Sequence, residues 1–426
     1  MRPWIRRTAA AAFGAALALA PPVTAPWAEA TRGDPAGRWT GAWGASLQRP
    51  ADPGAPWGGW SPQGFAEQSL RQVARVTATG PRIRVRLSHR YGAQPVRLAR
   101  ATVAASARGA AVRPDTLREL RFSGERETVL PIGAERLSDP VHLPVRAGEK
   151  LTVTFYFATA TGPVSYHMDA LTTSYRAEGD RTGHASADVF ETATSPSLYL
   201  LAGIEVAARH GRGTVVAFGD SITDGYGSTP GTDRRYPDRL ADQLHAGGRA
   251  YGVVNAGLSG NRLLTDSGCF GERGLARFRH EVLDRPGVRS VVVLLGINDI
   301  GAGGQPDFGC GTAPEVTADR LIEGHRALIR AAKRRGVTTV GATLTPFEGY
   351  ASYHTPEKER VRDQVNRWLR TSGAYDTVVD LDRLLADPRP GRGDALAPGY
   401  DSGDGIHPND AGMDAVAEAV ADALPG

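Results

Sequence analysis

Residues 215–225 read VVAFGDSITDG, and this stretch decides the fold of the second half of the chain. Its first four residues are apolar, as in a strand that is buried on both faces of a parallel sheet. Ser221 follows that run after Gly-Asp and precedes an Asp-Gly turn. Open α/β sheets hold their reactive groups at the carboxyl ends of their strands. We therefore expect Ser221 to be a nucleophile at the end of a buried strand.

Strand and helix patterns alternate along the rest of this half. Apolar residues at helical spacing predict long helices over 317–335 and 356–370, and Asn409 is placed to cap a final helix. The apolar runs predict strands over 214–218, 252–255, 289–295, 338–344 and 377–380. Such alternation is typical of a parallel sheet with right-handed crossovers and helices on both faces. We expect a doubly wound α/β domain.

The first half has a β pattern from about residue 68 to residue 201. Residues 82–88 alternate strictly, with Ile83, Val85 and Leu87 on one face, and residues 151–157 also alternate. Alternation predicts strands with one buried and one wetter face. Gly-containing turns recur between the runs, and we find no convincing helix, internal repeat or catalytic cluster here. The pattern favours an antiparallel sandwich.

The length of 426 residues is large for one domain, so we expect two. The composition, with 41% hydrophobic and 23% charged residues, is that of an ordinary globular protein. The leader contains a candidate first strand at Trp39 and Trp43. The predicted organisation is a signal peptide over 1–30, a leader over 31–60, a β-sandwich domain over 61–207 and an α/β domain over 208–426.

The N-terminus has the features of an export signal. Arg2, Arg6 and Arg7 precede a short apolar stretch over 8–20, and residues 28–30 read Ala-Glu-Ala, a small-x-small cleavage site. The alternative is an N-terminal membrane anchor, but the apolar stretch is shorter than the roughly 20 residues needed to span a membrane. We expect a secreted protein without a stable membrane span.

The net charge does not favour a nucleic-acid partner. Removal of residues 1–30 takes away three arginines and one glutamate, which lowers the formal net charge from +4 to +2. No basic cluster remains that would attract a polyanion.

Cys269 and Cys310 are the only cysteines. An even pair in an exported chain predicts a disulfide, with two free thiols as the alternative. Two cysteines without clustered histidines do not make a metal site, so we expect no metal.

A set of polar residues follows the predicted strands in the order that acyl transfer requires. The reaction needs a base for the serine proton, a group that orients the base, and donors for the oxyanion. Gly257, in Asn-Ala-Gly, lets a backbone N–H approach a reacting carbonyl, and the Asn298 amide in Gly-Ile-Asn-Asp can donate to the same oxygen. Asp404 stands three residues before His407, so one turn can present both side chains. We expect Asp404 to orient His407 as the base for Ser221.

Each of these patterns also has an ordinary structural interpretation. Gly-Asp-Ser is common in turns, Asn-Asp after a strand is usual loop chemistry, and a single histidine is more often structural than catalytic. The four patterns occur in order, each after a predicted strand or near the end of the chain. This combination favours catalysis.

Other polar residues have structural predictions. His325 lies on the apolar stripe of a predicted helix and should be in the core. Asp224 and Asp299 should hold loops through Asx-type hydrogen bonds.

The aromatic and histidine residues outside these motifs leave alternatives open. Trp43, Trp57 and Trp60 would suit a sugar-stacking platform, although tryptophans in a small β domain more often form its core. His167 would reach over the site if the β domain packs on the top of the sheet. His354 follows the fourth predicted strand and is a candidate to line a pocket. A disulfide would brace the loops that follow the two oxyanion elements.

The second half resembles the GDSL esterases/lipases, also called SGNH hydrolases, over roughly 214–426. Ser221 in Gly-Asp-Ser-Ile, Gly257 in Asn-Ala-Gly, Asn298 in Gly-Ile-Asn-Asp and His407 in Asp-Gly-Ile-His-Pro fall on the four motif positions of that family. An isoleucine replaces the leucine of the family's name. The resemblance implies a flavodoxin-like three-layer α/β/α fold and ester hydrolysis without a metal or an organic cofactor.

The resemblance also implies the roles of the site residues. The backbone N–H of Ser221, the N–H of Gly257 and the side chain of Asn298 would form the oxyanion hole, with Asp404 as the orienting acid and His407 as the base. The β-rich first half is similar, more loosely, to the N-terminal region of exported bacterial members, some of them close to carbohydrate-associated acylhydrolases. It is expected to be a jelly-roll-like β-sandwich.

The expected function is that of a secreted serine hydrolase that cleaves carboxylic esters through an acyl-enzyme on Ser221. A short-chain or carbohydrate acyl esterase is the leading interpretation. A lipase or phospholipase that acts on longer chains is one alternative, and a non-catalytic glycan-binding protein is another. The expected partner is an ester substrate, which could be an acylated carbohydrate, a small ester or a lipid. The sequence leaves the oligomeric state open.

Overall fold

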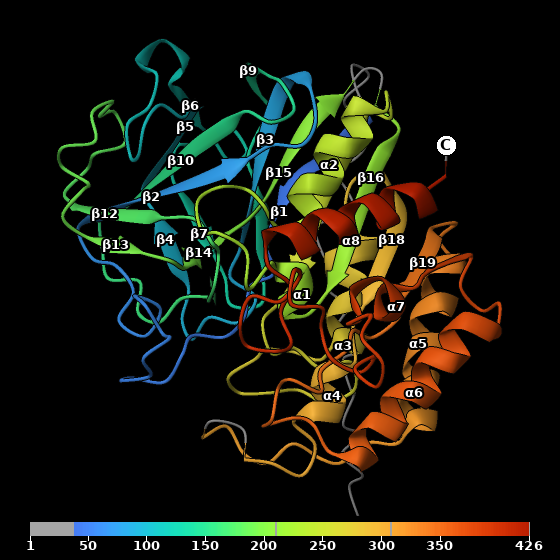
Figure 1. Ribbon diagram of the computed structural model, residues 1–426. Helices are drawn as coiled ribbons and strands as arrows, with labels where there is room; N and C mark the ends of the chain where they lie inside the picture. Colours follow the sequence, from blue (N-terminus) through green and yellow to red (C-terminus); the bar gives the residue numbers. More distant parts are fainter. Residues whose placement is uncertain (1–37, 209–210, 307–308, 426) are drawn as a thin grey trace, which may run out of the picture. The chain divides into compact units, whose positions relative to one another are not determined.

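The described part of the chain contains one parallel sheet with its helices, two antiparallel sheets and two small antiparallel ribbons (Figure 1). A computed structural model describes residues 38–425 apart from 209–210 and 307–308. The predicted signal peptide and the first residues of the predicted leader lie outside the described residues. Within them, no helix is long and apolar enough to cross a membrane.

The second half contains a five-stranded parallel sheet. Its strands are β16 (Gly213–Gly219), β17 (Tyr251–Gly257), β18 (Val288–Leu294), β19 (Thr338–Ala342) and β20 (Thr377–Val379). Their order in the sheet is β17-β16-β18-β19-β20, and every pair is parallel. This is the flavodoxin-like order, in which the direction of winding reverses beside the first strand. The five strands lie where the sequence predicts them, apart from residues at their ends.

Helices cover both faces of this sheet because its central strands are apolar on both sides (Figure 1). Val215 and Ala217 of β16 pack against one helical layer, while Val216 and Phe218 pack against the other. The first layer comprises α2 (Tyr236–Ala246), α7 (Leu381–Leu385) and α8 (Asp410–Ala423). The second comprises α3 (Gly274–Phe278), α5 (Ala318–Lys333) and α6 (Pro356–Thr371).

The ends of the longer helices agree with their capping residues. Thr317 caps α5, Thr355 caps α6 and Asn409 caps α8, each by accepting a backbone N–H of the first turn. Two short helices, α1 (Ser221–Asp224) and α4 (Ile297–Gly301), follow β16 and β18 directly. They place the predicted site residues at the carboxyl edge of the sheet. These two helices are too short to carry an apolar stripe, so the sequence pattern does not predict them.

The first half is a sandwich of two antiparallel sheets. One has the order β1-β15-β3-β8, with β9 also paired to β3, and the other has the order β13-β12-β2-β10-β5-β6. The strands of the first sheet are β1 (Arg38–Gly44), β3 (Gly80–Ser88), β8 (Glu135–Leu137), β9 (Val141–Val145) and β15 (Leu201–Ala208). Those of the second are β2 (Gln68–Arg75), β5 (Arg100–Ala105), β6 (Arg118–Leu120), β10 (Lys150–Phe157), β12 (Ser174–Glu178) and β13 (Thr194–Ser195). Two small ribbons pair β4 (Val96–Leu98) with β7 (Thr128–Leu130), and β11 (Tyr166–His167) with β14 (Leu198–Tyr199).

The core of the sandwich forms between the two sheets. Ile83, Val85 and Leu87 of β3 are buried there with Val153 and Phe155 of β10, as their alternation predicts. Two of the three tryptophans belong to the core and do not form a sugar-stacking platform. Trp43 and Trp60 are buried in this core, whereas Trp57 is half-buried beside the disulfide, in the lining of a cavity of about 190 Å³.

The prediction that one face of β10 is exposed to water is wrong. Thr152 and Thr154, on the other face, are buried as well. A buried arginine, Arg71, donates to the Thr154 hydroxyl, and its guanidinium lies over the Phe190 ring. Chain segments therefore cover this outer face, and the hydroxyl groups of the threonines are satisfied by side-chain partners such as Ser106.

The two halves meet along β1 and the edge strand β17. The Thr77 hydroxyl accepts the N–H of Val253 at 2.8 Å and lies 2.8 Å from its carbonyl, so it satisfies backbone groups that an edge strand leaves open. Gly41 of β1 lies so close to Gly252 of β17 that a Cβ at Gly252 would collide with the Gly41 carbonyl. Backbones approach this closely because neither residue has a side chain.

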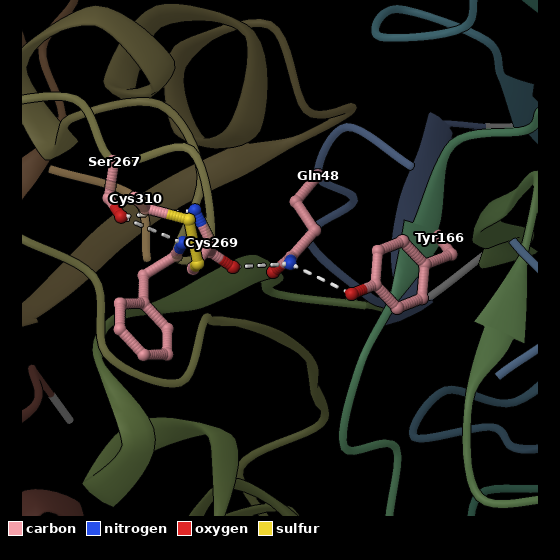
Figure 2. The surroundings of a disulfide bond; sticks show 6 residues. Gln48, Tyr166, Ser267, Cys269 and Cys310 are labelled. Carbon is pink, nitrogen blue, oxygen red and sulfur yellow. Dashed lines mark hydrogen bonds between the residues drawn. A yellow bond between two sulfur atoms is a disulfide. The ribbon is translucent and has the colours of Figure 1, made fainter. Parts of the chain in front are cut away.

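Cys269 and Cys310 form a disulfide, which confirms the prediction (Figure 2). Ser267 accepts the N–H of Cys269 from one side. From the other side, the Gln48 amide donates to the Cys269 carbonyl at 2.8 Å and lies 3.3 Å from the Tyr166 hydroxyl. Gln48 thus links the backbone at the disulfide to Tyr166 of the sandwich half.

Replacement of both cysteines by serine should lower the free energy of unfolding by about 4 kcal/mol. The bridge closes a loop with a sequence separation of 41, and chain-entropy arguments give this magnitude for such a loop. Denaturant unfolding of the double variant measures the loss. An unchanged unfolding midpoint would show that the bridge does not stabilise the fold.

Candidate active site

Ser221 is the first residue of α1, immediately after β16. The Asp220 side chain caps this short helix by accepting the N–H of Ile222 at 3.1 Å. Gly219 is required before the turn, because a Cβ there would collide with the Thr223 side chain and the Leu294 carbonyl. The Ser221 side chain is held in place by this sharp turn and is 8% exposed.

Ser221, His407 and Asp404 form a continuous hydrogen-bonded chain. Ser221 Oγ lies 2.9 Å from His407 Nε2, and His407 Nδ1 lies 2.5 Å from Asp404 Oδ2. The other carboxylate oxygen accepts the backbone N–H groups of Ile406 and His407, at 3.1 and 2.9 Å. The structure therefore brings together the three residues that the sequence predicts for the triad.

The Asp404 carboxylate is stabilised in its charged form. Partial burial alone would raise the pKa of this carboxyl, but hydrogen bonds from the His407 ring and backbone outweigh that effect and lower the pKa to about 2. Asp404 is therefore ionised at neutral pH. A fixed negative charge on this side of the ring would stabilise an imidazolium at His407.

Gly257 lies directly beside Gly219 in the parallel sheet. A Cβ at this position would collide with the backbone of Thr223 and Asp224, so the residue must be glycine for α1 to lie where it does. The Gly257 N–H donates to Asn255 Oδ1 at 2.8 Å. A substrate oxygen would therefore share this N–H with Asn255, a partner that the motif alone does not indicate.

The Asn298 amide is held in one orientation. Its Oδ1 accepts the Tyr353 hydroxyl at 2.9 Å, and its Nδ2 donates to the Asn261 carbonyl at 3.1 Å. An amide nitrogen has two hydrogens, so this arrangement leaves the second one for another acceptor. Tyr353 and Asn261 thus determine which way the predicted oxyanion donor faces.

Arg277 ties the ends of the first two strands together. Its guanidinium is buried and donates to the carbonyls of Gly219 and Ala256 at 2.6 and 2.8 Å, and to Asn261 Oδ1 at 2.8 Å. Glu281, one helical turn further on, neutralises the charge at 2.8 Å. Sequence reasoning missed this residue. The only feature of the sequence that could have indicated the Arg277–Glu281 ion pair is the i, i+4 spacing of the two residues. The sequence does not show that both side chains are buried.

His325 and Asp299, which were predicted to have structural roles, bind residues outside the triad. His325 is buried and lies 2.7 Å from the Tyr375 hydroxyl, as predicted for a core residue. Asp299 accepts the N–H groups of Leu263 and Leu264 at 2.7 and 2.9 Å, and burial raises its pKa to about 6. Asp299 thus holds a loop as predicted, but the expected Asx-type hydrogen bonds are wrong, because its partners lie 35 and 36 residues away in the chain. The same holds for Asp224, whose carboxylate accepts from Ser259.

His354, Tyr226 and His167 have different contacts, and only Tyr226 packs on a residue of the triad. His354 faces Glu359, with 3.9 Å between its Nε2 and the carboxylate. Tyr226 was not predicted, but its ring centroid lies 4.6 Å from that of His407, and the side chain is 43% exposed. His167 meets Asp224 instead of the reacting atoms, at 3.0 Å.

Among the described residues, one group of side chains could hold a metal ion, formed by Glu359, Asp363 and Asp394. It shares no residue with the Ser221 site. Arg362 supplies positive charge to two of these carboxylates.

The fold and the site define the class of the protein. A flavodoxin-like sheet places a serine at its switch point, in hydrogen-bond contact with a histidine whose other ring nitrogen contacts a carboxylate, and these are the groups that acyl transfer uses. Comparison with known proteins agrees. Residues 217–415 match the model of the GDSL-like lipase/acylhydrolase family. This part of the chain is a GDSL-like lipase/acylhydrolase domain, and the protein is a carboxylic ester hydrolase.

Solved structures resemble about half of this chain. A lipase/acylhydrolase from Enterococcus faecalis is 22% identical, with 49% of this chain and 93% of that chain covered and a TM-score of 0.38. A GDSL-like lipase from Bacteroides thetaiotaomicron is 19% identical, with 49% and 86% covered and a TM-score of 0.34. A variant of an acetyl xylan esterase from Geobacillus stearothermophilus is 25% identical, with 49% and 94% covered and a TM-score of 0.38. A search of curated proteins gives no match.

Replacement of Tyr353 by phenylalanine should lower kcat on an aryl acetate by roughly 2- to 10-fold and leave KM nearly unchanged. The change removes one hydrogen bond, worth about 0.5–1.5 kcal/mol, that fixes the Asn298 amide. Asn298→Ala, which removes the donor itself, should cost about 10²–10³ in kcat. Steady-state kinetics of both variants test this ranking.

Tyr156→Phe is the matched control, because Tyr156 is a half-buried tyrosine of the sandwich half. It should retain the parent kcat. The interpretation of Tyr353 fails if Tyr353→Phe and Tyr156→Phe have the same kcat.

Proposed function

We propose that the protein is an exported serine esterase that removes short acyl groups through an acyl-enzyme on Ser221. The observation that carries this proposal is the hydrogen-bonded chain from Ser221 through His407 to Asp404, at the switch point of the sheet. A second observation is the fixed amide of Asn298, with one hydrogen left for an oxyanion.

The geometry suits a two-step reaction. In the first step, His407 Nε2 takes the proton of Ser221 Oγ while that oxygen attacks the ester carbonyl, and the tetrahedral oxyanion accepts a hydrogen bond from the Asn298 amide. As this intermediate collapses, His407 returns the proton to the alcohol oxygen and the ester C–O bond breaks. In the second step, His407 takes a proton from water, which attacks the acyl-enzyme. The acid leaves and Ser221 recovers its proton.

The surroundings of Ser221 favour a small, polar ester over a long apolar chain. The side chains that contact Ser221, pack on His407 or hold the Asn298 amide are polar: His407, Tyr226, Tyr353 and Asn298 itself. A long acyl chain gains its binding energy from burial against an apolar surface, which this set of residues does not supply. We extend the proposal to acyl groups on small alcohols and sugars.

The disulfide supports the proposal of export. Structural disulfides form and persist in oxidising compartments outside the cytosol. Cys269 and Cys310 are joined in the structure, and the predicted signal peptide would direct the chain to such a compartment.

Two sets of measurements test the function. Ser221→Ala and His407→Ala should each abolish turnover of nitrophenyl acetate, because neither variant can form the acyl-enzyme. Ser372→Ala, an exposed serine after α6, is the matched control and should be fully active. Parent-level turnover in either of the first two variants would disprove the assignment.

The second set compares nitrophenyl esters of increasing chain length. A preference for acetate is expected, since the site offers polar contacts. A preference for octanoate or longer chains would contradict the short-acyl proposal and indicate a lipase.

A further inference from the structure

One histidine of the sandwich half contacts α1, the short helix that begins with Ser221. His167, the last residue of β11, lies with its Nε2 3.0 Å from Oδ1 of Asp224, the last residue of α1. Ser221 is the first residue of that same four-residue helix. The contact therefore joins the β-rich half to the element that carries the nucleophile, at a depth where His167 is only 3% exposed.

Both ring nitrogens of His167 face acceptors. Nδ1 lies 2.7 Å from the backbone carbonyl of Ser46, and Nε2 faces the Asp224 carboxylate and, at 3.3 Å, the carbonyl of Asp169. A neutral imidazole has one N–H, so one of these contacts would then place a lone pair against an oxygen. The ring is buried, and water cannot easily take the place of the missing donor. Only the doubly protonated ring satisfies both sides.

Asp224 passes this contact on to the oxyanion side of the site. Its second oxygen, Oδ2, accepts the N–H and the hydroxyl of Ser259, at 3.2 and 3.0 Å. Its backbone carbonyl accepts Asn255 Nδ2 at 3.2 Å, and Asn255 Oδ1 in turn accepts the N–H of Gly257. One carboxylate thus connects the end of α1 with the loop that follows β17.

We propose that His167 is an imidazolium that positions Asp224, so that the β-rich half is part of the catalytic centre. The positive charge on the ring holds the Asp224 carboxylate in place, and the carboxylate holds α1 and the Gly257 loop in one arrangement. His167 is a positioning residue, since it touches Asp224 and not the reacting atoms. Its effect on ester hydrolysis rests on the proposed function, whereas its charge state does not.

The charges around His167 support this assignment. Asp224 faces it from α1, and Asp169 follows it in the chain. From the end of β1, Ser46 offers its carbonyl to the ring and its hydroxyl to Glu281, which is paired with Arg277. Burial lowers the pKa of His167, but the attraction of Asp224 and the hydrogen bonds to Asp224 and Ser46 raise it, and the pKa is about 8.

The sign of the pH dependence follows from this raised pKa. The charged ring contributes its full effect below the ordinary pKa of histidine, about 6.5, and the effect is lost as the pH rises through about 8. The alkaline limb of the activity profile should therefore reflect His167.

Nitrogen NMR of protein with isotopically labelled histidine tests the charge state directly. The expected result at neutral pH is a His167 ring with a proton on both nitrogens, assigned by the loss of its signals in His167→Gln. His325 is the internal control, because burial lowers its pKa to about 4 and its ring should be neutral in the same sample. In Asp224→Asn, the pKa of His167 should fall. A neutral His167 ring at neutral pH in the parent protein would overturn the proposal.

Kinetics test the positioning role. His167→Gln should lower kcat on an aryl acetate on the order of 10-fold with KM little changed, as expected for a small displacement of catalytic groups, and should remove the alkaline limb. His142→Gln, an exposed histidine of β9, is the matched control and should change neither. The positioning role is wrong if His167→Gln keeps the parent kcat and pH profile. If the parent protein hydrolyses no ester, the proposed function fails, while the NMR result still decides the charge state.

Discussion

A single buried guanidinium, that of Arg277, holds the active-site edge of the sheet together. It donates to backbone carbonyls at the ends of β16 and β17 and to the side-chain oxygen of Asn261. The backbone carbonyl of Asn261 accepts a hydrogen bond from the Asn298 amide. The nucleophile and both predicted oxyanion elements therefore depend on one charged group. A buried charge is costly unless it is paired and fully hydrogen-bonded, and Glu281 together with these acceptors meets that condition. The partners of Arg277 include the backbone carbonyl of Gly219, two residues before Ser221, and that of Ala256, next to Gly257.

The same constraint explains why the β-rich half is packed so closely against the α/β half. Glu281 accepts the hydroxyl of Ser46, a residue that follows β1, and the Ser46 carbonyl accepts His167. Thr77 covers the open edge of β17. Each of these contacts satisfies a polar group that would otherwise be buried without a partner, which costs about 1–3 kcal/mol per group. The sandwich therefore supplies hydrogen-bond partners to polar groups of the α/β half.

Local patterns were enough to predict the architecture and the motif residues. The strands of the parallel sheet are continuous apolar runs, and Ser221 and Asn298 each follow a strand whose end is visible in the sequence. The Asp404/His407 pair stands just before the final helix, whose cap Asn409 is also visible in the sequence. The supporting residues could not be predicted in this way. Arg277 binds mostly backbone carbonyls, which leave no trace in the sequence, and His167 meets Asp224 only because the two halves are folded against each other. The burial of Thr152 was missed for the same reason, because the covering segments are distant in the chain.

The central claim is that Ser221 is a nucleophile activated by His407. The most direct measurement is mass spectrometry of the folded protein after treatment with a fluorophosphonate, which reacts with a serine only when a neighbouring base removes its proton. We expect one phosphonyl group, located by peptide mapping on Ser221 and absent from His407→Ala. Modification at a different serine, or no modification of the folded protein, would contradict it.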